Sequence, residues 1–201
     1  MVTECEFLNI YNEFYPKINQ YLSKIVGPND AEDVAQDVFD KISRNLGGFK
    51  KKSKLSTWIY RIATNTAIDR LRSAAYKNSG EHTIFEEDRG PEGENELYVH
   101  KQPAIDQSII HKEMSDCIRE YITNLPPDYR TVIVMSELEG MSNQKIADVL
   151  EISLDNVKVR LHRARAKMRE ALDSGCDFYH NEQEILACDR KKTQILPKTP
   201  Q

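Results

Sequence analysis

The 201-residue sequence contains few turn-forming residues and no long apolar run. It has only 8 glycines and 8 prolines, and several of them cluster between residues 80 and 103. No window approaches the roughly 18 consecutive apolar residues of a membrane span. The opening residues, MVTECEFLNI, lack the basic start and the long apolar core of a signal peptide. The sequence therefore predicts a cytoplasmic protein.

Cysteine is also scarce, and recognisable catalytic motifs are absent. The four cysteines, at positions 5, 117, 176 and 188, form no Cys-x2-Cys pair, which favours free thiols in a reducing compartment. The sequence has no glycine-rich phosphate-binding loop, no HExxH motif and no evident pairing of a nucleophile with a base. We therefore expect a protein that is not an enzyme and needs no cofactor.

Charge, by contrast, is abundant and is distributed in blocks. The net charge of −4 hides two basic blocks: residues 50–72 hold seven basic residues and one acid, and residues 156–169 hold six basic residues and no acid. Residues 81–96 hold seven acids and one arginine, and residues 30–40 hold five acids and no base. Two basic blocks on an acidic chain indicate two separate contacts with a polyanion, and the acidic blocks suit a basic protein partner.

Apolar periodicity predicts an all-α protein, and strong strand signals are absent throughout. Apolar residues recur at 3- and 4-residue spacing over much of the chain, as they do on the buried face of a helix. Helices are expected in seven segments, which are 3–26, 30–46, 57–72, 113–124, 128–137, 143–150 and 154–172.

The expected helices fall into two small domains, 1–72 and 113–173, because the stretch between them differs in composition. Residues 73–112 are acidic, contain several glycines and prolines and lack helical periodicity, so they predict a flexible linker. Residues 174–201 form a polar C-terminal extension.

One face of the helix 57–72 combines side chains that suit separated DNA strands. At 100° per residue, five side chains fall within an arc of about 80°. The arc offers an aromatic ring to stack on an unpaired base, an amide to read a base edge and guanidinium groups for phosphates. The alternative is a solvated helix face with the indole buried. The five residues are Trp58, Arg61, Asn65, Asp69 and Arg72, and the lysine-rich loop before them adds attraction to the DNA backbone.

Residues 141–172, MSNQKIADVLEISLDNVKVRLHRARAKMREAL, have the layout of a helix-turn-helix. Ser142 and Ser153 are expected to cap its two helices, and Glu151 occupies the turn position where glycine is common. An apolar stripe on the second helix faces inward and leaves a polar arc for the major groove. That arc holds Asp155, Lys158, Val159, His162 and Arg163, and Arg160, Arg165, Lys167 and Arg169 flank it where phosphates would lie.

Three segments together resemble the sigma-70 family of bacterial RNA polymerase sigma factors, in its small two-domain extracytoplasmic-function (ECF) group. The segments read DAEDVAQDVFDKI from residue 30, LSTWIYRIATNTAIDRLR from residue 55, and LPPDYRTVIVMSELEGMSNQKIADVLEISLDNVKVRLHRARAKM from residue 125. They are similar to regions 2 and 4 of that group and lie in the same order. The resemblance implies a factor that gives core RNA polymerase its promoter specificity, melts promoter DNA, and is controlled by an anti-sigma factor or by its own tail.

The resemblance also implies a role for individual residues. Residues 30–42 would lie on the polymerase, and the contacts expected there are Asp33, Gln36, Asp37 and Phe39. Phe49 and Asn65 would hold a flipped base of the −10 element, while Trp58, Arg61 and Ile62 would support strand opening. The remaining −10 contacts are Lys50, Lys51, Lys52, Lys54, Asp69 and Arg72. The −35 element would meet Asp155, Lys158, Val159, Arg160, His162, Arg163 and Arg165.

The C-terminal extension permits three interpretations. Cys176, His180 and Cys188 are three candidate ligands for zinc or copper, although structural zinc sites usually have four, and Cys117 qualifies only if the fold brings it near. Cys176 and Cys188 are also a candidate redox pair. In the simplest interpretation the extension is ordered and docks its apolar side chains, Phe178, Tyr179, Ile185 and Leu186, on the second domain.

Two other functions compete with that of a sigma factor. A one-component DNA-binding regulator would use only the helix-turn-helix, with residues 1–72 serving as a sensor or dimerisation domain. An interaction module, such as a metal-sensing adaptor, would depend mainly on the C-terminal extension. The single-strand face of 57–72 distinguishes the first alternative, because such a regulator does not need it.

Overall fold

The computed structural model describes residues 4–49, 53–78, 105–180, 184 and 186–191, and it confirms the all-α prediction. Helices α1 (Glu4–Val26), α2 (Pro28–Asn45) and α3 (Leu55–Asn78) form a first bundle, with a short 3-10 turn at Leu46–Gly48 after α2. Helix α4 (Ile105–Thr123) opens a second group. It continues with α5 (Pro127–Ile133), a π-helical turn (Val134–Leu138), α6 (Asn143–Leu150) and α7 (Leu154–Gly175).

The first bundle forms because each helix has one continuous apolar face. Ile18, Leu22 and Ile25 of α1 are fully buried, and α2 adds a stripe that includes Val38 and Ile42. Helix α3 contributes the small side chains of Ala63 and Ala67, which let it approach closely. The buried hydroxyl of Tyr21 on α1 lies 2.8 Å from the hydroxyl of Thr64 on α3, so the polar groups inside this core satisfy each other.

The helix-turn-helix prediction is confirmed, including its two caps. The Ser142 hydroxyl accepts a hydrogen bond from the Lys145 amide, and the Ser153 hydroxyl accepts one from the Asn156 amide. Glu151 adopts the left-handed conformation at the end of α6, with φ 56° and ψ 39°. This conformation is less favourable for glutamate than for glycine, so the backbone of the turn is strained at Glu151.

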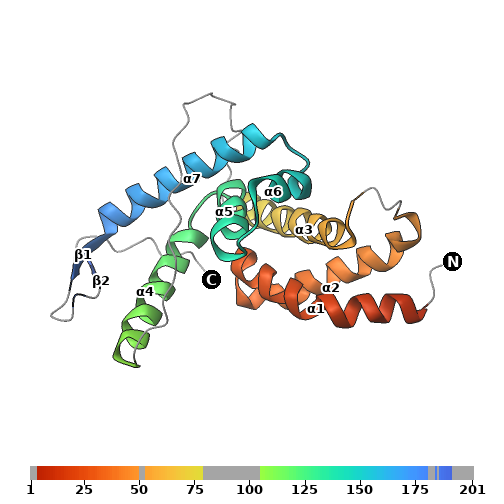
Figure 1. Ribbon diagram of the computed structural model, residues 1–201, viewed down its shortest axis with the longest axis horizontal. Helices are drawn as coiled ribbons and strands as arrows, with labels where there is room; N and C mark the ends of the chain where they lie inside the picture. Colours follow the sequence, from red (N-terminus) through yellow and green to blue (C-terminus); the bar gives the residue numbers. More distant parts are fainter. Residues whose placement is uncertain (1–3, 50–52, 79–104, 181–183, 185, 192–201) are drawn as a thin grey trace.

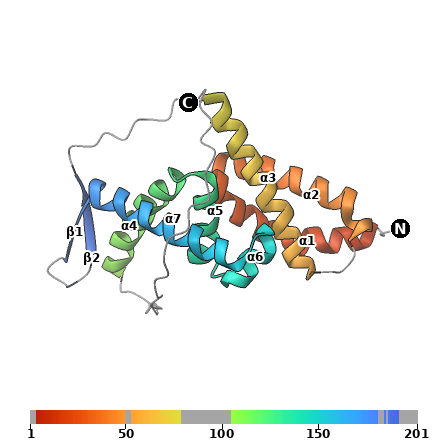
Figure 2. The same cartoon turned by 90° about the horizontal axis from the view of Figure 1, so that it is seen from above.

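The two helical groups pack against each other and share one hydrophobic core. Helices α5 and α6 lie beside α3 in both views (Figure 1, Figure 2). Two polar contacts cross the junction in partly buried positions. The Lys24 ammonium lies 2.6 Å from a carboxylate oxygen of Glu139, and the Arg130 guanidinium donates to the carbonyl of Ile25 at 2.9 Å. Burial lowers the pKa of Arg130 to about 10.

The last described elements form a two-stranded antiparallel hairpin, β1 (Cys176–His180) and β2 (Leu186–Arg190), at the opposite end of the molecule from the N-terminus (Figure 1). Strands were not predicted, because the pairing partner and the supporting helices α4 and α7 are tertiary features. The expected docking of aromatic side chains is wrong, since Phe178 and Tyr179 are 43% and 45% exposed and Leu186 is also exposed. Cys176 and Ala187 are the buried residues of the hairpin instead. Ile185 lies outside the described residues.

Within the described parts of the chain, no helix is long and apolar enough to cross a membrane. Helix α3 extends to Asn78 and α4 begins at Ile105, so both reach into the segment 73–112 that was predicted as linker. Residues 79–104 lie outside the described residues.

Candidate nucleic-acid interface

Helix α3 carries the predicted single-strand face on its surface. Asn65, Asp69 and Arg72 are exposed, while Trp58 and Arg61 are half-buried. The indole of Trp58 packs against the core on one side, and the Phe49 ring, just before α3, lies 5.1 Å from it, centroid to centroid. The Asn65 amide therefore lies outside the hydrophobic core, and the Trp58 indole is only partly buried in it.

The arginines of this face are held by the second helical group. The Arg61 guanidinium lies 2.5 Å from a carboxylate oxygen of Glu151 and donates to the carbonyl of Asp148 at 2.6 Å. Arg72 donates to the carboxylate of Asp128 at 3.1 Å. The turn of the helix-turn-helix therefore covers part of α3, and carboxylates occupy positions that suit DNA phosphates.

Other predicted residues of this face differ in their surroundings. Lys54 is exposed. Ile62 is half-buried and packs against the core, so only part of its side chain is available to a ligand. Lys50, Lys51 and Lys52 lie outside the described residues.

Helix α7 separates an apolar face from a polar one. Val157, Leu161 and Ala164 are buried, as the apolar stripe predicts. Asp155, Lys158 and His162 are exposed on the other side, and Val159, Arg160 and Arg163 are half-buried.

Arg165, at the edge of the polar face of α7, is already paired. Its guanidinium donates twice to one carboxylate oxygen of Glu137, at 2.7 and 3.2 Å. The predicted contact with phosphate therefore competes with an internal ion pair. Sequence reasoning missed all these counterions, Glu137, Glu151 and Asp128, because they lie 28 to 90 positions from their arginines.

The acidic face of α2 points outward. Asp33, Gln36 and Asp37 are exposed, as a surface for a basic protein requires. Phe39 is a correction to the predicted contacts: it is only 3% exposed, and its ring packs edge-on to Tyr11 at 5.0 Å and near Tyr15 at 5.6 Å. The aromatic ring supports α2 from within, because burying it stabilises the bundle more than exposure would.

The candidate metal ligands of the C-terminal extension are not assembled around one point. His180 pairs with Leu186, four residues along β1 from Cys176, which separates the two side chains by roughly 13 Å. Among the described residues, no three His, Cys, Asp or Glu side chains group to hold a metal ion. Cys117, which qualified only if the fold brought it near, does lie beside Cys176 in a small core cluster.

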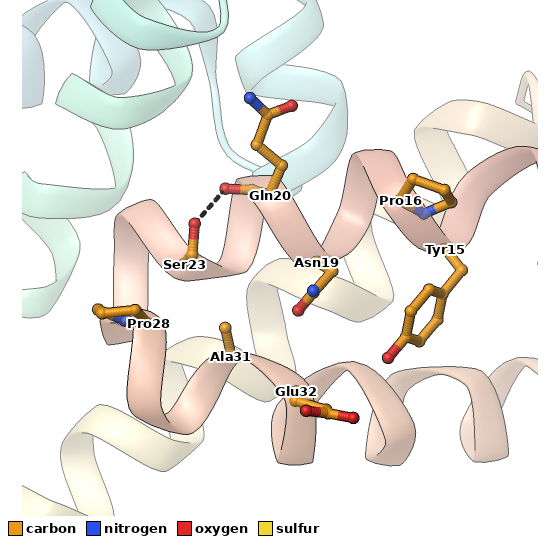
Figure 3. Close-up of a pocket in the computed structure, with 8 residues that line it drawn as sticks. All are labelled: Tyr15, Pro16, Asn19, Gln20, Ser23, Pro28, Ala31 and Glu32. Carbon is orange, nitrogen blue, oxygen red and sulfur yellow. Dashed lines mark hydrogen bonds between the residues drawn. The ribbon is translucent and has the colours of Figure 1, made fainter.

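A solvent-open groove of about 540 Å³ runs between α1 and α2 (Figure 3). Among the described residues that line the groove, Glu32 supplies the single carboxylate and Tyr15 supplies a phenol. Burial raises the pKa of the Tyr15 phenol, and the neighbouring Tyr11 and Glu32 raise it further. The Asn19 side-chain oxygen lies buried there without a hydrogen-bond partner among the described residues. These groups do not form a pair suited to acid–base or nucleophilic catalysis.

Both helical groups are similar to regions of known proteins. Residues 10–76 match the family profile described as Sigma-70 region 2, and residues 115–168 match Sigma-70, region 4. The chain is 35% identical over 172 residues to the ECF RNA polymerase sigma factor SigW of Bacillus subtilis, spanning 83% of this chain and 88% of that protein. It is 32% identical over 161 residues to the RNA polymerase sigma-H factor of Pseudomonas aeruginosa, spanning 76% and 82% of the two chains.

Solved structures give the same fold. The sigma factor RpoE from Bartonella quintana, in complex with the anti-sigma factor NepR, aligns with a TM-score of 0.57 at 20% identity, covering 84% of this chain and 97% of that one. CnrH, in complex with the cytosolic domain of CnrY, aligns with a TM-score of 0.55 at 24% identity, covering 85% and 90% of the two chains. Together with the two matched regions and the sequence relatives, this places the chain in the sigma-70 family of RNA polymerase sigma factors, in its ECF group.

Proposed function

We propose that the two DNA-facing helices of this sigma factor divide promoter recognition between them. Helix α3, with the loop before it, binds the separated non-template strand of the −10 element. Helix α7 docks in the major groove of the intact −35 element. In this proposal the protein performs no covalent chemistry and acts in the cytoplasm with core polymerase.

The observation that carries the proposal is the exposed amide of Asn65 on α3, flanked along the helix by Arg61 and Arg72. An amide can form two hydrogen bonds with the edge of an unpaired base. Melting costs about 1–2 kcal/mol per base-pair step, and capture of an extruded base offsets part of that cost. The nearby rings of Phe49 and Trp58 supply stacking surface for the same base.

Phosphate binding by Arg61 and Arg72 of α3 requires their present contacts with the second helical group to open. The Arg61 guanidinium is occupied by Glu151 and Asp148 of α6 and its turn, so phosphate must displace a carboxylate. An ion pair as exposed as Arg72–Asp128 contributes only about 0–1 kcal/mol, but moving the groups apart would also expose part of their shared apolar core, a larger cost that contacts with DNA and polymerase would have to offset. Helix α7 needs no such opening, because Lys158 and His162 already face solvent.

The acidic face of α2 is assigned to core polymerase, through Asp33, Gln36 and Asp37. These two carboxylates and one amide are exposed on one side of α2, where they suit a basic helical partner. We further propose an anti-sigma factor as a regulatory partner, since the aligned structure of RpoE is a complex with the anti-sigma factor NepR. Co-purification of the chain with candidate membrane or cytosolic inhibitors tests that assignment.

Run-off transcription with core polymerase and a pool of genomic promoters tests the proposed function as a whole. Asn65→Ala is expected to abolish open-complex formation, measured by permanganate reactivity of the melted strand, while −35 duplex binding stays within about twofold because no base-reading group of α7 has changed. The matched control is Asn12→Ala, which removes an exposed amide from α1 far from both faces.

Two results would contradict the proposal. If no promoter in the pool supports initiation, the chain does not act as a sigma factor on its own. If Asn65→Ala weakens −35 duplex binding as much as it weakens opening, the division of labour between α3 and α7 is wrong.

A further inference from the structure

Three of the four cysteines meet where the C-terminal hairpin docks on α4 and α7. Cys117 of α4 is 9% exposed and Cys176 at the start of β1 is 3% exposed, and both pack with Tyr121 in a separate small cluster. Cys188 of β2 is half-buried and packs against the same cluster. Cys5, at the other end of the molecule, is exposed on α1 (Figure 1). The fold thus collects three thiols that are 12 to 71 positions apart in sequence.

Cys176 is the central member of this trio. Its thiol donates to the Tyr121 hydroxyl at 3.4 Å, and it also has hydrogen-bonding contacts with the thiols of both Cys117 and Cys188. In the sheet register Cys176 pairs with Arg190 and Cys188 with Phe178, so the two cysteines are diagonal neighbours on one face of the hairpin. Diagonal neighbours of an antiparallel pair are roughly 7–8 Å apart, just beyond the roughly 7 Å that a disulfide bridges without backbone movement, so the bond requires a small shift of the two strands.

The surroundings hold these thiols in place while leaving one of them reachable. Arg190 binds the carboxylate of Glu120, and the Lys191 amide donates to the Gly175 carbonyl, so the open end of the hairpin is fixed against α4 and the end of α7. Tyr121 fits so tightly that a Cβ on Gly175 would clash with its hydroxyl. Only Cys188 combines contact with a second thiol and partial exposure to solvent.

We propose that Cys176 and Cys188 form a thiol–disulfide site that a low-molecular-weight disulfide such as oxidised glutathione converts to a Cys176–Cys188 bond. The Cys188 thiolate attacks the oxidant, forms a mixed disulfide and releases one glutathione thiolate. The Cys176 thiolate then attacks the Cys188 sulfur and releases the second glutathione. The two protein thiols lose two electrons and two protons, and one oxidised glutathione becomes two reduced molecules. This site is independent of the proposed roles of α3 and α7 in DNA binding.

Burial raises the pKa of the Cys188 thiol, and the neighbouring Cys176 and Cys117 raise it further. Burial raises the pKa of Cys117 in the same way, with Cys176 as the next cause. Little thiolate is present at neutral pH, so exchange is slow and the site is best measured at equilibrium.

The test is a redox titration of the full chain in reduced and oxidised glutathione buffers, followed to equilibrium by intact mass and by peptide mapping. The expected product lacks the mass of two hydrogen atoms and contains a Cys176–Cys188 cross-link. Cys188→Ser and Cys176→Ser should both abolish it, whereas Cys117→Ser and Cys5→Ser should retain it. Circular dichroism checks that each variant is folded, and the half-buried Cys188→Ser keeps the test decisive if the fully buried Cys176→Ser unfolds.

Three results would overturn the proposal. The first is a mapped bond that uses Cys117 or Cys5. The second is a persistent glutathione adduct on Cys188 without an internal bond. The third is fully reduced protein even in the most oxidising buffer.

Discussion

The two DNA-facing helices differ in how much of each face the protein itself occupies. On α3, Arg61 and Arg72 are bonded to carboxylates of the other helical group. On α7, Lys158 is paired with Asp155 one turn away, at 3.5 Å, and His162 is exposed. The proposed DNA face of α7 is therefore largely open to solvent, whereas the proposed DNA face of α3 is partly covered by ion pairs to the second helical group.

The largest expected effect comes from the core that joins the two groups. Ile146 on α6 is fully buried, so Ile146→Ala should lower the free energy of unfolding by about 2–5 kcal/mol through lost burial and a cavity. Urea denaturation followed by circular dichroism measures it. Leu8→Ala, at a 51% exposed position, is the control and should cost less than about 1 kcal/mol.

Because the core is continuous, the same experiment tests how strongly the groups are coupled. One cooperative transition is expected in both the parent protein and Ile146→Ala. If two transitions appear and Ile146→Ala shifts only that of the second helical group, the helices α3 and α7 belong to domains that unfold independently.

A smaller effect is expected at the partly buried ion pair of Lys24 and Glu139. The two side chains are 24% and 17% exposed, so Glu139→Gln leaves an ammonium without its charged partner and should cost about 1–3 kcal/mol. Thermal or urea unfolding measures the change. Asp40→Asn breaks the Arg44–Asp40 pair, whose side chains are 77% and 71% exposed, and should cost less than about 0.5 kcal/mol. Equal costs for both variants would mean that the junction ion pair does not hold the groups together.

The contrast between the two faces can be sharpened with two variants that each remove one negative charge. Glu151→Asn removes the carboxylate partner of Arg61 on α3, leaves its bond to the Asp148 carbonyl, and keeps a residue that tolerates the left-handed turn. Glu137→Gln releases Arg165 on α7. We expect the first to tighten binding of a single-stranded −10 oligonucleotide by roughly 2- to 5-fold, and the second to do the same for a −35 duplex. Fluorescence anisotropy at low salt measures both, and equal effects on both probes would refute the separation of the faces.

The effect confined to the narrowest range of conditions concerns the alkaline stability of the second group. Burial is the main cause that raises the pKa of Tyr121 to about 12 from its ordinary value of 10. Between these values the unfolded chain has lost the proton and the folded chain retains it, so this contribution to stability is complete below pH 10 and is lost as pH rises through 12. Tyr121→Phe should flatten the decline in melting temperature over that interval.

Tyr179→Phe, at a 45% exposed position on the hairpin, is the control for that measurement and should leave the pH profile unchanged. A Tyr121→Phe profile as steep as that of the parent protein would show that other phenols carry the decline. Tyr21 of the first bundle is the main alternative, because burial also raises its pKa strongly.

Local pattern was sufficient for the helix-turn-helix and for the helical faces. Ser142 and Ser153 were predictable as caps because a cap is a contact over three residues. The buried stripe of Val157, Leu161 and Ala164 followed from helical periodicity alone. The exposure of Asn65 followed in the same way, since it lies opposite the apolar side of α3.

Errors arose where the outcome depended on distant residues. Phe39 was expected to face a partner, but rings from α1 enclose it. Phe178 and Tyr179 were expected to dock, but they remain on the outer part of a hairpin whose existence depends on a strand partner ten residues away. Neither packing partner could be read from the neighbouring sequence.

The sequence by itself determined which side chains lie on the polar face of each helix, because helical spacing and capping are local and each helix carries its own apolar and polar faces. Only the tertiary structure decided which of those side chains are already occupied. The pairing of Arg61 with Glu151 and the meeting of Cys117, Cys176 and Cys188 join residues far apart in the chain. Such contacts arise when helices bury their apolar faces against each other, and that packing depends on the whole set of faces at once.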